Sequence, residues 1–298
     1  MKVLNKIVTG VIVYAVIVAL LFGCNVMWTS PSHYKVENSQ NLEEPIMSMD
    51  EYDTIINTHR RPYIYSIKGE KGEVFILGVE HSKDPKHPQF EAIRQNWEKA
   101  KPTIALIEGR LGFLFIWFQD PIEKFGEGGL TSYLAKKNGA DLYSWEPTRE
   151  NEIDFLLEEF TAAQIAMFYS FRPYFSNMRY GKPDNPEKKL QEYLKSRTNY
   201  EHIRGIYKSW EDLDKAWQKD FPEINWRDYS DEYGWPEGYL SEMANDSNLS
   251  RDYHMVNIIL ELLENGETVF ITMGASHAPR IEKTLSKALN SNPIAIIK

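Results

Sequence analysis

The chain contains very little cysteine and no surplus of positive charge. One cysteine stands among its 298 residues, so no disulfide can form within the chain. Lysine and arginine number 34 against 43 aspartate and glutamate residues, which gives a net charge of −9. Because no basic stripe is available to displace counterions from phosphates, we expect no nucleic-acid partner. Hydrophobic residues make up 42% of the chain, which is ordinary for a globular protein with a full core.

Residues 1–24 have the pattern of a targeting segment. Lys2 and Lys6 precede an apolar run over residues 7–22, as in the n-region and h-region of a secretory signal. Cys24 follows, and the pattern resembles the bacterial lipobox, in which that cysteine is lipidated and becomes the mature N-terminus. The alternative is an uncleaved anchor helix, because residues 7–28 are long enough to span a bilayer. Both interpretations predict a membrane-anchored, extracytoplasmic protein.

The remainder divides into a tether and an α/β domain. Residues 25–60 are polar with scattered apolar positions and predict a tether. Residues 61–298 alternate short β-branched runs with segments of helical spacing, which predicts a mixed, mostly parallel central sheet with flanking helices. An aromatic-rich helical insertion at about residues 149–249 interrupts this alternation. We interpret its aromatic residues as the core of a small helical cap, with a groove for sugar or peptide as the alternative.

A glycine and a histidine recur at the ends of two predicted strands. Residues 72–82 read GEVFILGVEHS and residues 266–277 read GETVFITMGASH, so that His81 and His277 each close a Gly-x-x-His motif after a Val-Phe-Ile strand. We expect each glycine to let the chain turn and to permit close approach to the backbone. Glu108 follows the strand TIALI, and Glu146 follows ADLYSW. Because ligands of open α/β sheets bind outside the carboxyl ends of the strands, the four polar side chains should share one rim.

Two imidazoles and a carboxylate on one rim are suited to a divalent metal ion. We predict His81, His277 and Glu108 as ligands of Mn, Zn, Co or Fe, with the remaining carboxylate, Glu146 or Glu108, as a general base. Arg251, just after a predicted N-cap at Ser250, is expected to steady an oxyanion. Secondary candidates are Glu80, His87, Arg149 and Arg280, for which surface charge or a solvated loop position is the simpler interpretation.

The paired motifs Gly78–His81 and Gly274–His277, with a glutamate between them and an arginine before the last helix and strand, resemble the TraB/TIKI (GumN-like) family. The resemblance covers residues 62–147 and 250–298. The wider superfamily includes the erythromycin esterases and the ChaN-type haem-binding lipoproteins. TIKI-like members are divalent-metal-dependent proteases, the esterases use the corresponding histidine as a general base, and ChaN-like members bind haem. The esterases have a glutamate directly after the glycine, where this chain has Val79.

The resemblance implies an α/β fold of two related halves with a site at His81, His277, Glu108 and Arg251. We therefore expect a membrane-anchored extracytoplasmic hydrolase that acts on a peptide or ester bond of a peptide or small-molecule substrate. The alternative is a non-catalytic lipoprotein that binds haem or another ligand through the same histidines. An inactive scaffold is the third hypothesis.

Overall fold

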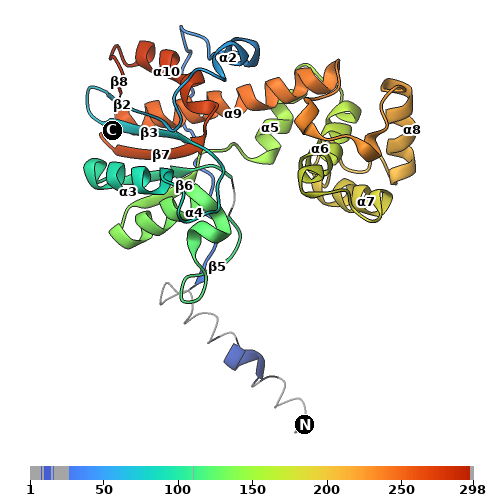
Figure 1. The fold of residues 1–298 in the computed structure, drawn as a ribbon, viewed down its shortest axis with the longest axis horizontal. Helices are drawn as coiled ribbons and strands as arrows, with labels where there is room; N and C mark the ends of the chain where they lie inside the picture. Colours follow the sequence, from blue (N-terminus) through green and yellow to red (C-terminus); the bar gives the residue numbers. More distant parts are fainter. Residues whose placement is uncertain (1–7, 9, 15, 17–26, 110, 296–298) are drawn as a thin grey trace. The chain divides into compact units, whose positions relative to one another are not determined.

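The computed structural model describes residues 8, 10–14, 16, 27–109 and 111–295 (Figure 1). The predicted signal segment, with Cys24, lies outside the described residues except for a few positions between 8 and 16, which are helical and solvent-exposed. Among the described residues, no helix combines the length and apolar character that crossing a bilayer requires.

A mixed sheet organises the larger part of the chain (Figure 1). Its strands lie in the order β6-β4-β7-β3-β2-β8. The bounds are β2 (Tyr63–Lys68), β3 (Glu73–Val79), β4 (Ile104–Ile107), β6 (Asp141–Ser144), β7 (Thr268–Gly274) and β8 (Ile294–Ala295). Neighbours among β6, β4, β7 and β3 run parallel, whereas β2 is antiparallel to both β3 and β8. The predicted α/β class with a mixed, mostly parallel sheet is confirmed.

Strands β3 and β7, which carry the two Gly-x-x-His motifs, are direct neighbours. They pair in parallel along their whole length, with Gly78 opposite Met273 and Val79 opposite Gly274. Both Val-Phe-Ile runs are buried along nearly all of each strand, as expected for central strands covered on both faces. Two segments nearly 200 positions apart in sequence therefore end at the same edge of the sheet.

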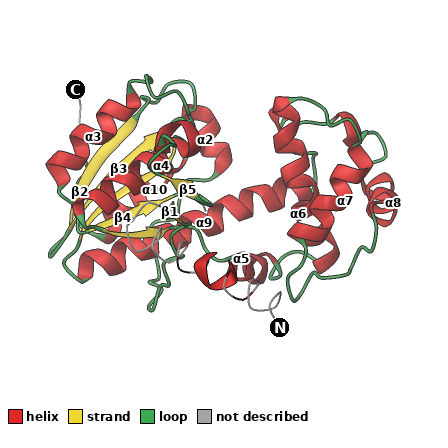
Figure 2. Cartoon of the chain, turned by 90° about the horizontal axis from the view of Figure 1, so that it is seen from below, coloured by secondary structure: helices red, strands yellow, loops and turns green. Residues whose placement is uncertain are grey.

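Helices cover both faces of the sheet (Figure 2). On one face lie α3 (Gln89–Ala100) and α4 (Pro121–Asn138), and on the other lies α10 (His277–Ala288). The α3 side chains Phe90, Ile93 and Trp97, which recur at helical spacing, are buried against the strands, and the Trp97 ring meets Phe270 of β7 edge-on at 5.1 Å. The buried side chains of α3 lie on one face of the helix, which packs on the sheet.

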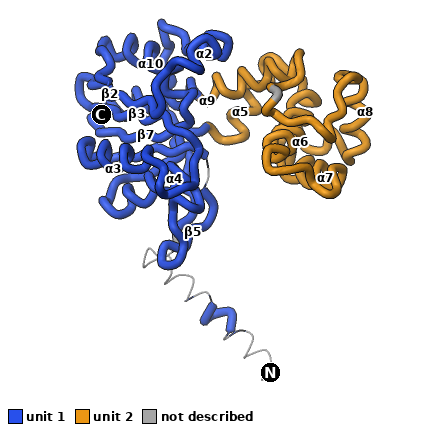
Figure 3. Tube along the Cα trace, in the orientation of Figure 1, with its two compact units in different colours: residues 1–146, 252–298 blue, residues 147–251 orange. Residues whose placement is uncertain are grey.

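The chain forms two compact units (Figure 3). Unit 1 comprises residues 1–146 and 252–298 and contains the sheet, while unit 2 comprises residues 147–251. All four strand-end residues predicted to share a rim belong to unit 1.

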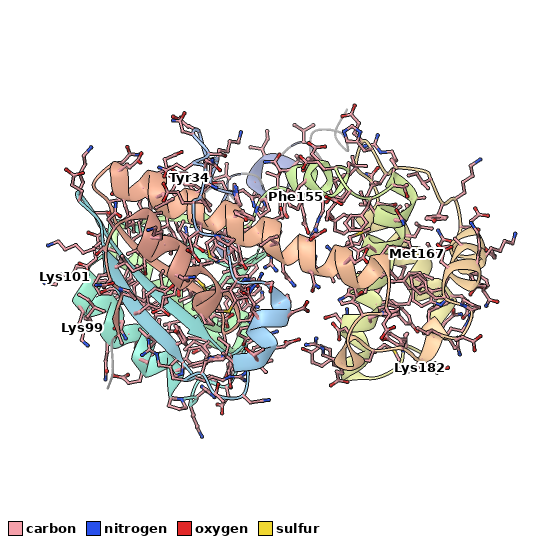
Figure 4. All side chains as sticks on the ribbon, turned by 90° about the horizontal axis from the view of Figure 1, so that it is seen from above. Tyr34, Lys99, Lys101, Phe155, Met167 and Lys182 are labelled. Atoms are coloured by element: carbon pink, nitrogen blue, oxygen red, sulfur yellow. The ribbon has the colours of Figure 1, made fainter. Side chains whose placement is uncertain are left out.

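Residues from Trp28 onward, which the sequence suggested were a tether, are built into unit 1. Strand β1 (Met27–Trp28) pairs antiparallel with β5 (Leu114–Phe115), and helix α2 (Met49–Ile55) follows. The scattered apolar residues of this segment explain the difference, because Trp28, Ile46 and Tyr52 are all buried. Tyr34 lies beside helix α9 (Tyr239–Glu264) and donates its hydroxyl proton to Glu261 at 2.8 Å (Figure 4).

Unit 2 is helical, with an aromatic core. Its helices are α5 (Arg149–Leu156), α6 (Ala162–Asn177), α7 (Pro186–Arg197), α8 (Trp210–Asp220) and the first half of α9 (Tyr239–Glu264), with 3₁₀ turns η1 (Met178–Tyr180), η2 (Trp226–Asp228) and η3 (Asp231–Tyr233). Trp217 and Trp226 are fully buried and both contact Phe171, at ring distances of 4.5 and 5.6 Å. The interpretation of the insertion as a helical unit with an aromatic core is confirmed.

Helix α9 begins at Tyr239, so the predicted N-cap at Ser250 is wrong. Leu240, Met243 and Ala244 are buried at helical spacing before that serine, and no glycine or proline separates them from the predicted start. Arg251 therefore lies inside a long helix and not at a helix N-terminus.

Candidate functional site

The carboxyl ends of four parallel strands bring the predicted polar residues to one edge of unit 1. His81 comes two residues after β3, and Glu108 directly follows β4. Glu146 comes two residues after β6, and His277 is the first residue of α10, shortly after β7. Since β7 lies between β3 and β4, the middle of this edge is the end of β7 at Gly274.

The absence of a side chain at Gly274 lets His81 and Glu108 meet. A Cβ added there would lie 3.1 Å from Nε2 of His81 and 3.4 Å from Oε2 of Glu108. The Gly274 amide donates a hydrogen bond to that same Oε2 at 2.8 Å. Gly78 has a parallel role, because its Cβ would lie 2.6 Å from the Cβ of Ala278 on α10. Neither glycine has a positive φ, so close approach and not a turn is the reason for both.

His277 is held from behind by a buried acid. His277 is 5% exposed, and its Nδ1 lies 2.5 Å from Oδ1 of Asp252, a fully buried carboxylate on α9. The other oxygen of Asp252 pairs with Nη1 of Arg280 at 2.7 Å. Arg280 is also buried and donates from Nε to the carbonyl of Met47 at 2.8 Å. This chain of contacts compensates each buried charge and fixes the ring.

His81 has a carboxylate partner of its own. Its Nδ1 lies 2.6 Å from Oε1 of Glu127, which is 7% exposed. Glu127 reaches this position because α4 is kinked at Gly126, where φ is 57°. A Cβ at Gly126 would lie 2.6 Å from the carbonyl oxygen of Ser82, so the kink packs tightly against the residue after His81.

These partners set the tautomer of both imidazoles. An ionised carboxylate can only accept, so the Nδ1 facing it in each ring is the protonated nitrogen. The neutral ring then carries its lone pair on Nε2. In His81 that atom lies over Gly274 beside Glu108, and in His277 it lies 4.0 Å from Oε1 of Glu108. The Nε2 lone pairs of both rings thus lie on the side of Glu108 along the same part of the rim.

Two further residues border this cluster. The indole of Trp145, fully buried at the end of β6, meets the His277 ring edge-on at 5.3 Å. Its Nε1 donates to the carbonyl of Thr272 on β7 at 3.2 Å, which fixes the indole. Oε2 of Glu146 lies 3.6 Å from the Cβ position of Gly109, the residue after Glu108. Glu146 thus follows Glu108 along the rim.

The secondary candidates lie in three different places. Arg280 is part of the cluster through Asp252. Glu80 and His87, 3.7 Å apart, line a separate cavity of about 460 Å³ with Arg60, Arg61 and residues of α3. Arg149 belongs to unit 2, where it pairs with Glu152 and lies over the Tyr169 ring.

Arg251 also belongs to unit 2, and its predicted role at the rim stays a prediction. There it is buried, and Nη1 donates to Oδ1 of Asn248 at 3.4 Å.

The sequence interpretation missed Asp252 and Glu127. Asp252 had a usable signal, since it falls on the apolar face of its helix with Met255, Val256 and Ile259, and an acid on such a face needs a buried partner. Glu127 stands between glycines in the run FGEGG, which is unusual within a helix. Neither signal identifies the histidine that each acid contacts.

The cluster contains nitrogen and oxygen atoms of the kind that bind divalent metal ions, but these atoms are not yet close enough together to hold one. Within residues 27–109 and 111–295 no three His, Cys, Asp or Glu side chains are already grouped so as to hold an ion. Two Nε2 atoms, each backed by a carboxylate on Nδ1, nevertheless match the way metal-binding histidines are oriented in proteins. No family model, curated protein or solved structure matches the chain.

Proposed function

We propose that the protein is a divalent-metal-dependent hydrolase, anchored to a membrane on its extracytoplasmic side, which cleaves a peptide or ester bond. The observation that supports this most is the orientation of the two motif histidines. Each is fixed by a carboxylate on Nδ1, Glu127 for His81 and Asp252 for His277, and each presents Nε2 on the side of Glu108. A buried histidine needs a partner for a ring nitrogen in any case, but here two rings are held so that both direct Nε2 towards the same carboxylate.

In this proposal His81, His277 and Glu108 hold the metal ion. The set of two imidazoles and one carboxylate is common among hydrolytic sites. When bound, the ion would polarise the scissile carbonyl and lower the pKa of a bound water molecule. Glu127 and Asp252 keep both rings in the binding tautomer, while Glu146 accepts the proton released in hydrolysis. Trp145 shields one side of His277 from solvent and strengthens the electrostatic interactions around it.

Membrane anchoring is supported by the sequence of the first 24 residues. Lys2 and Lys6 before an apolar run, with Cys24 after it, fit either a lipidated cysteine or an uncleaved helix, and both interpretations predict that unit 1 lies outside the cytoplasm.

Cobalt titration of the purified full-length chain tests the site without a known substrate. Co²⁺ bound by nitrogen and oxygen ligands gives visible absorption bands that free Co²⁺ lacks in that form, and zinc competition then reports affinity. We expect the bands to disappear in His81→Ala and in His277→Ala. His87→Ala is the matched control, because this second histidine lies only six positions from His81 but lines the other cavity. Glu127→Gln should retain binding with an affinity weaker by about 10–100-fold.

The outcome that would remove the metal proposal is cobalt binding of equal affinity in His81→Ala, His277→Ala and the unsubstituted chain. Haem titration of the same samples checks the alternative. A Soret band that depends on His81 or His277, without ordered cobalt binding, would favour a haem-binding lipoprotein instead.

A further inference from the structure

Three large aromatic side chains lie exposed on one loop of unit 1. Phe113, Trp117 and Phe118 are 59%, 74% and 74% exposed, and they flank strand β5 within the run GFLFIWFQD. Phe118 stacks on Phe115 at a ring distance of 5.3 Å, so the aromatic surface is continuous around the end of the strand. A group of neighbouring exposed apolar side chains of this size marks an interaction site.

The chain places this loop next to its own apolar N-terminal segment. Met27 pairs with Phe115 and Trp28 with Leu114. The apolar run over residues 7–22 ends five residues before Met27. Five residues span at most about 18 Å even when fully extended. Whatever surface holds the apolar run must therefore lie within reach of the aromatic loop. The described residues of that run, such as Val11, Ile12 and Val13, are helical and more than half exposed, so unit 1 does not bury them.

Lysine side chains surround the same end of unit 1. Lys124 lies over the ring of Phe125 at 5.3 Å, and Lys136 lies over the ring of Trp28 at 5.5 Å. Two acids also lie at the start of α4: Asp120 accepts from the amides of Ile122 and Glu123 as the helix cap, and the side chain of Glu123 is exposed. Exposed aromatic rings with lysines beside them therefore form one end of unit 1. This combination suits the headgroup layer of a bilayer that contains anionic lipid.

We propose that residues 113–118 dock on the bilayer that holds the N-terminal apolar run, with Phe113, Trp117 and Phe118 inserted at the level of the headgroups. The inference rests on the membrane anchoring proposed above, in the form of an uncleaved N-terminal helix, and adds a second contact to it. A single anchor followed by a short linker leaves unit 1 free to rotate over the membrane. Two contacts so close in space, one at the anchor and one at β5, restrict that rotation and hold the rim in one orientation to the bilayer.

A fluorescent probe at single cysteines in the full-length chain tests this. Cys24→Ser removes both the native thiol and the lipidation site, so the uncleaved apolar run is the anchor in every labelled chain. An environment-sensitive dye is then attached at Phe118→Cys in the loop, at Val13→Cys in the apolar run, or at Lys283→Cys. Lys283, on α10, is 79% exposed and serves as the matched control, because Figure 1 places α10 at the opposite end of unit 1 from β5. Each protein is reconstituted into vesicles of zwitterionic and anionic phospholipid. Quenching by nitroxide-labelled lipid and by aqueous iodide is then measured, and circular dichroism checks that each labelled chain is folded.

The expected result is loss of dye fluorescence to the lipid quencher at positions 13 and 118, with emission shifted to shorter wavelength, and quenching by iodide alone at position 283. Lipid quenching at position 13 together with iodide quenching at 118 would overturn the loop contact and leave the anchor intact. Absence of lipid quenching at both positions would overturn the anchor and the loop together. Shielding of position 118 only at high protein density, without lipid quenching, would show a contact between copies and equally overturn the proposal. Cobalt binding is measured on the same samples and reports on the hydrolase site independently.

Discussion

The motif glycine at the end of β3 offers a direct test of how the site is assembled. A Cβ at Gly78 would lie 2.6 Å from the Cβ of Ala278 and 3.4 Å from both the Tyr63 Cβ and the Ala275 carbonyl oxygen. Two carbon atoms in contact ordinarily lie about 3.5–4.0 Å apart. Gly78→Ala therefore forces the first turn of α10, which begins with His277, away from β3 by roughly 1 Å.

The change in the free energy of unfolding caused by Gly78→Ala can be estimated from two opposing effects. Adding a methyl group to a packed interior costs about 1–3 kcal/mol. Replacing glycine also reduces the conformational entropy of the unfolded chain, which stabilises the folded state by about 0.4–1 kcal/mol. The net loss is then roughly 1–2 kcal/mol. At roughly 2–4 °C for each kcal/mol in a unit of this size, the midpoint of thermal unfolding should fall by about 2–8 °C.

Calorimetry on a set of four variants separates this clash from a general effect of the substitution. Gly69→Ala is the matched control, because its Cβ would meet no atom closer than 3.5 Å. Ala278→Gly, combined with Gly78→Ala, removes the atom that the new methyl group strikes. The double variant should be less destabilised than the sum of the two single variants by about 1 kcal/mol or more. If Gly78→Ala is as stable as Gly69→Ala, or the two sites show no coupling, the close contact between β3 and α10 is refuted.

Two further predictions concern buried charge. Asp252→Asn leaves the guanidinium of Arg280, which is 1% exposed, without its ion pair, and should lower the free energy of unfolding by about 3–5 kcal/mol in urea titrations. The double variant Asp252→Asn/Arg280→Gln should recover most of that loss, because no buried charge is then left unpaired. Equal losses in both variants would contradict this. Burial lowers the pKa of His254 below its ordinary value of 6.5, with His33 adding to the shift and a hydrogen bond to the backbone of Tyr34 opposing it. The unfolded chain therefore binds this proton first, and stability present above pH 6.5 should decline as the pH falls from 6.5 towards the lowered pKa. Urea unfolding at about pH 7.5 and 5.5 should show a smaller decline in His254→Gln, and an equal decline would rule out the contribution.

The rim was predictable because it depends on local signals combined with one general rule. VFIL and VFIT are short apolar runs between polar residues, and each identifies a strand without help from the rest of the chain. The rule that parallel strands present their carboxyl ends at one edge then brings His81, Glu108 and His277 together. The neighbouring positions of β3 and β7, the central fact of the fold, follow from no local pattern in the sequence.

The groups that orient the histidines were not predictable in the same way. Asp252 reaches His277 across 25 positions, and Glu127 reaches His81 across 46, through a helix kink that depends on the contact between Gly126 and Ser82. Such contacts are decided by packing between elements and leave little trace in periodicity. The start of α9 was missed for a related reason, because a polar residue such as Ser250 is an N-cap only when the residues before it are not helical.

Because the aromatic loop is joined to the site at both ends, only some substitutions in it test membrane contact separately from metal binding. The segment that carries Phe113, Trp117 and Phe118 leaves the rim at Glu108 and returns to it at Glu127, so carboxylates of the site stand at both of its ends. Replacing an exposed ring removes apolar surface without disturbing packing, and it should leave cobalt affinity unchanged. Leu114 lies in the same segment but is only 3% exposed, so its loss would create a cavity and shift the backbone towards both ends. Membrane contact must therefore be tested at the exposed rings, because a defect at Leu114 would weaken docking and metal binding together and could not distinguish them.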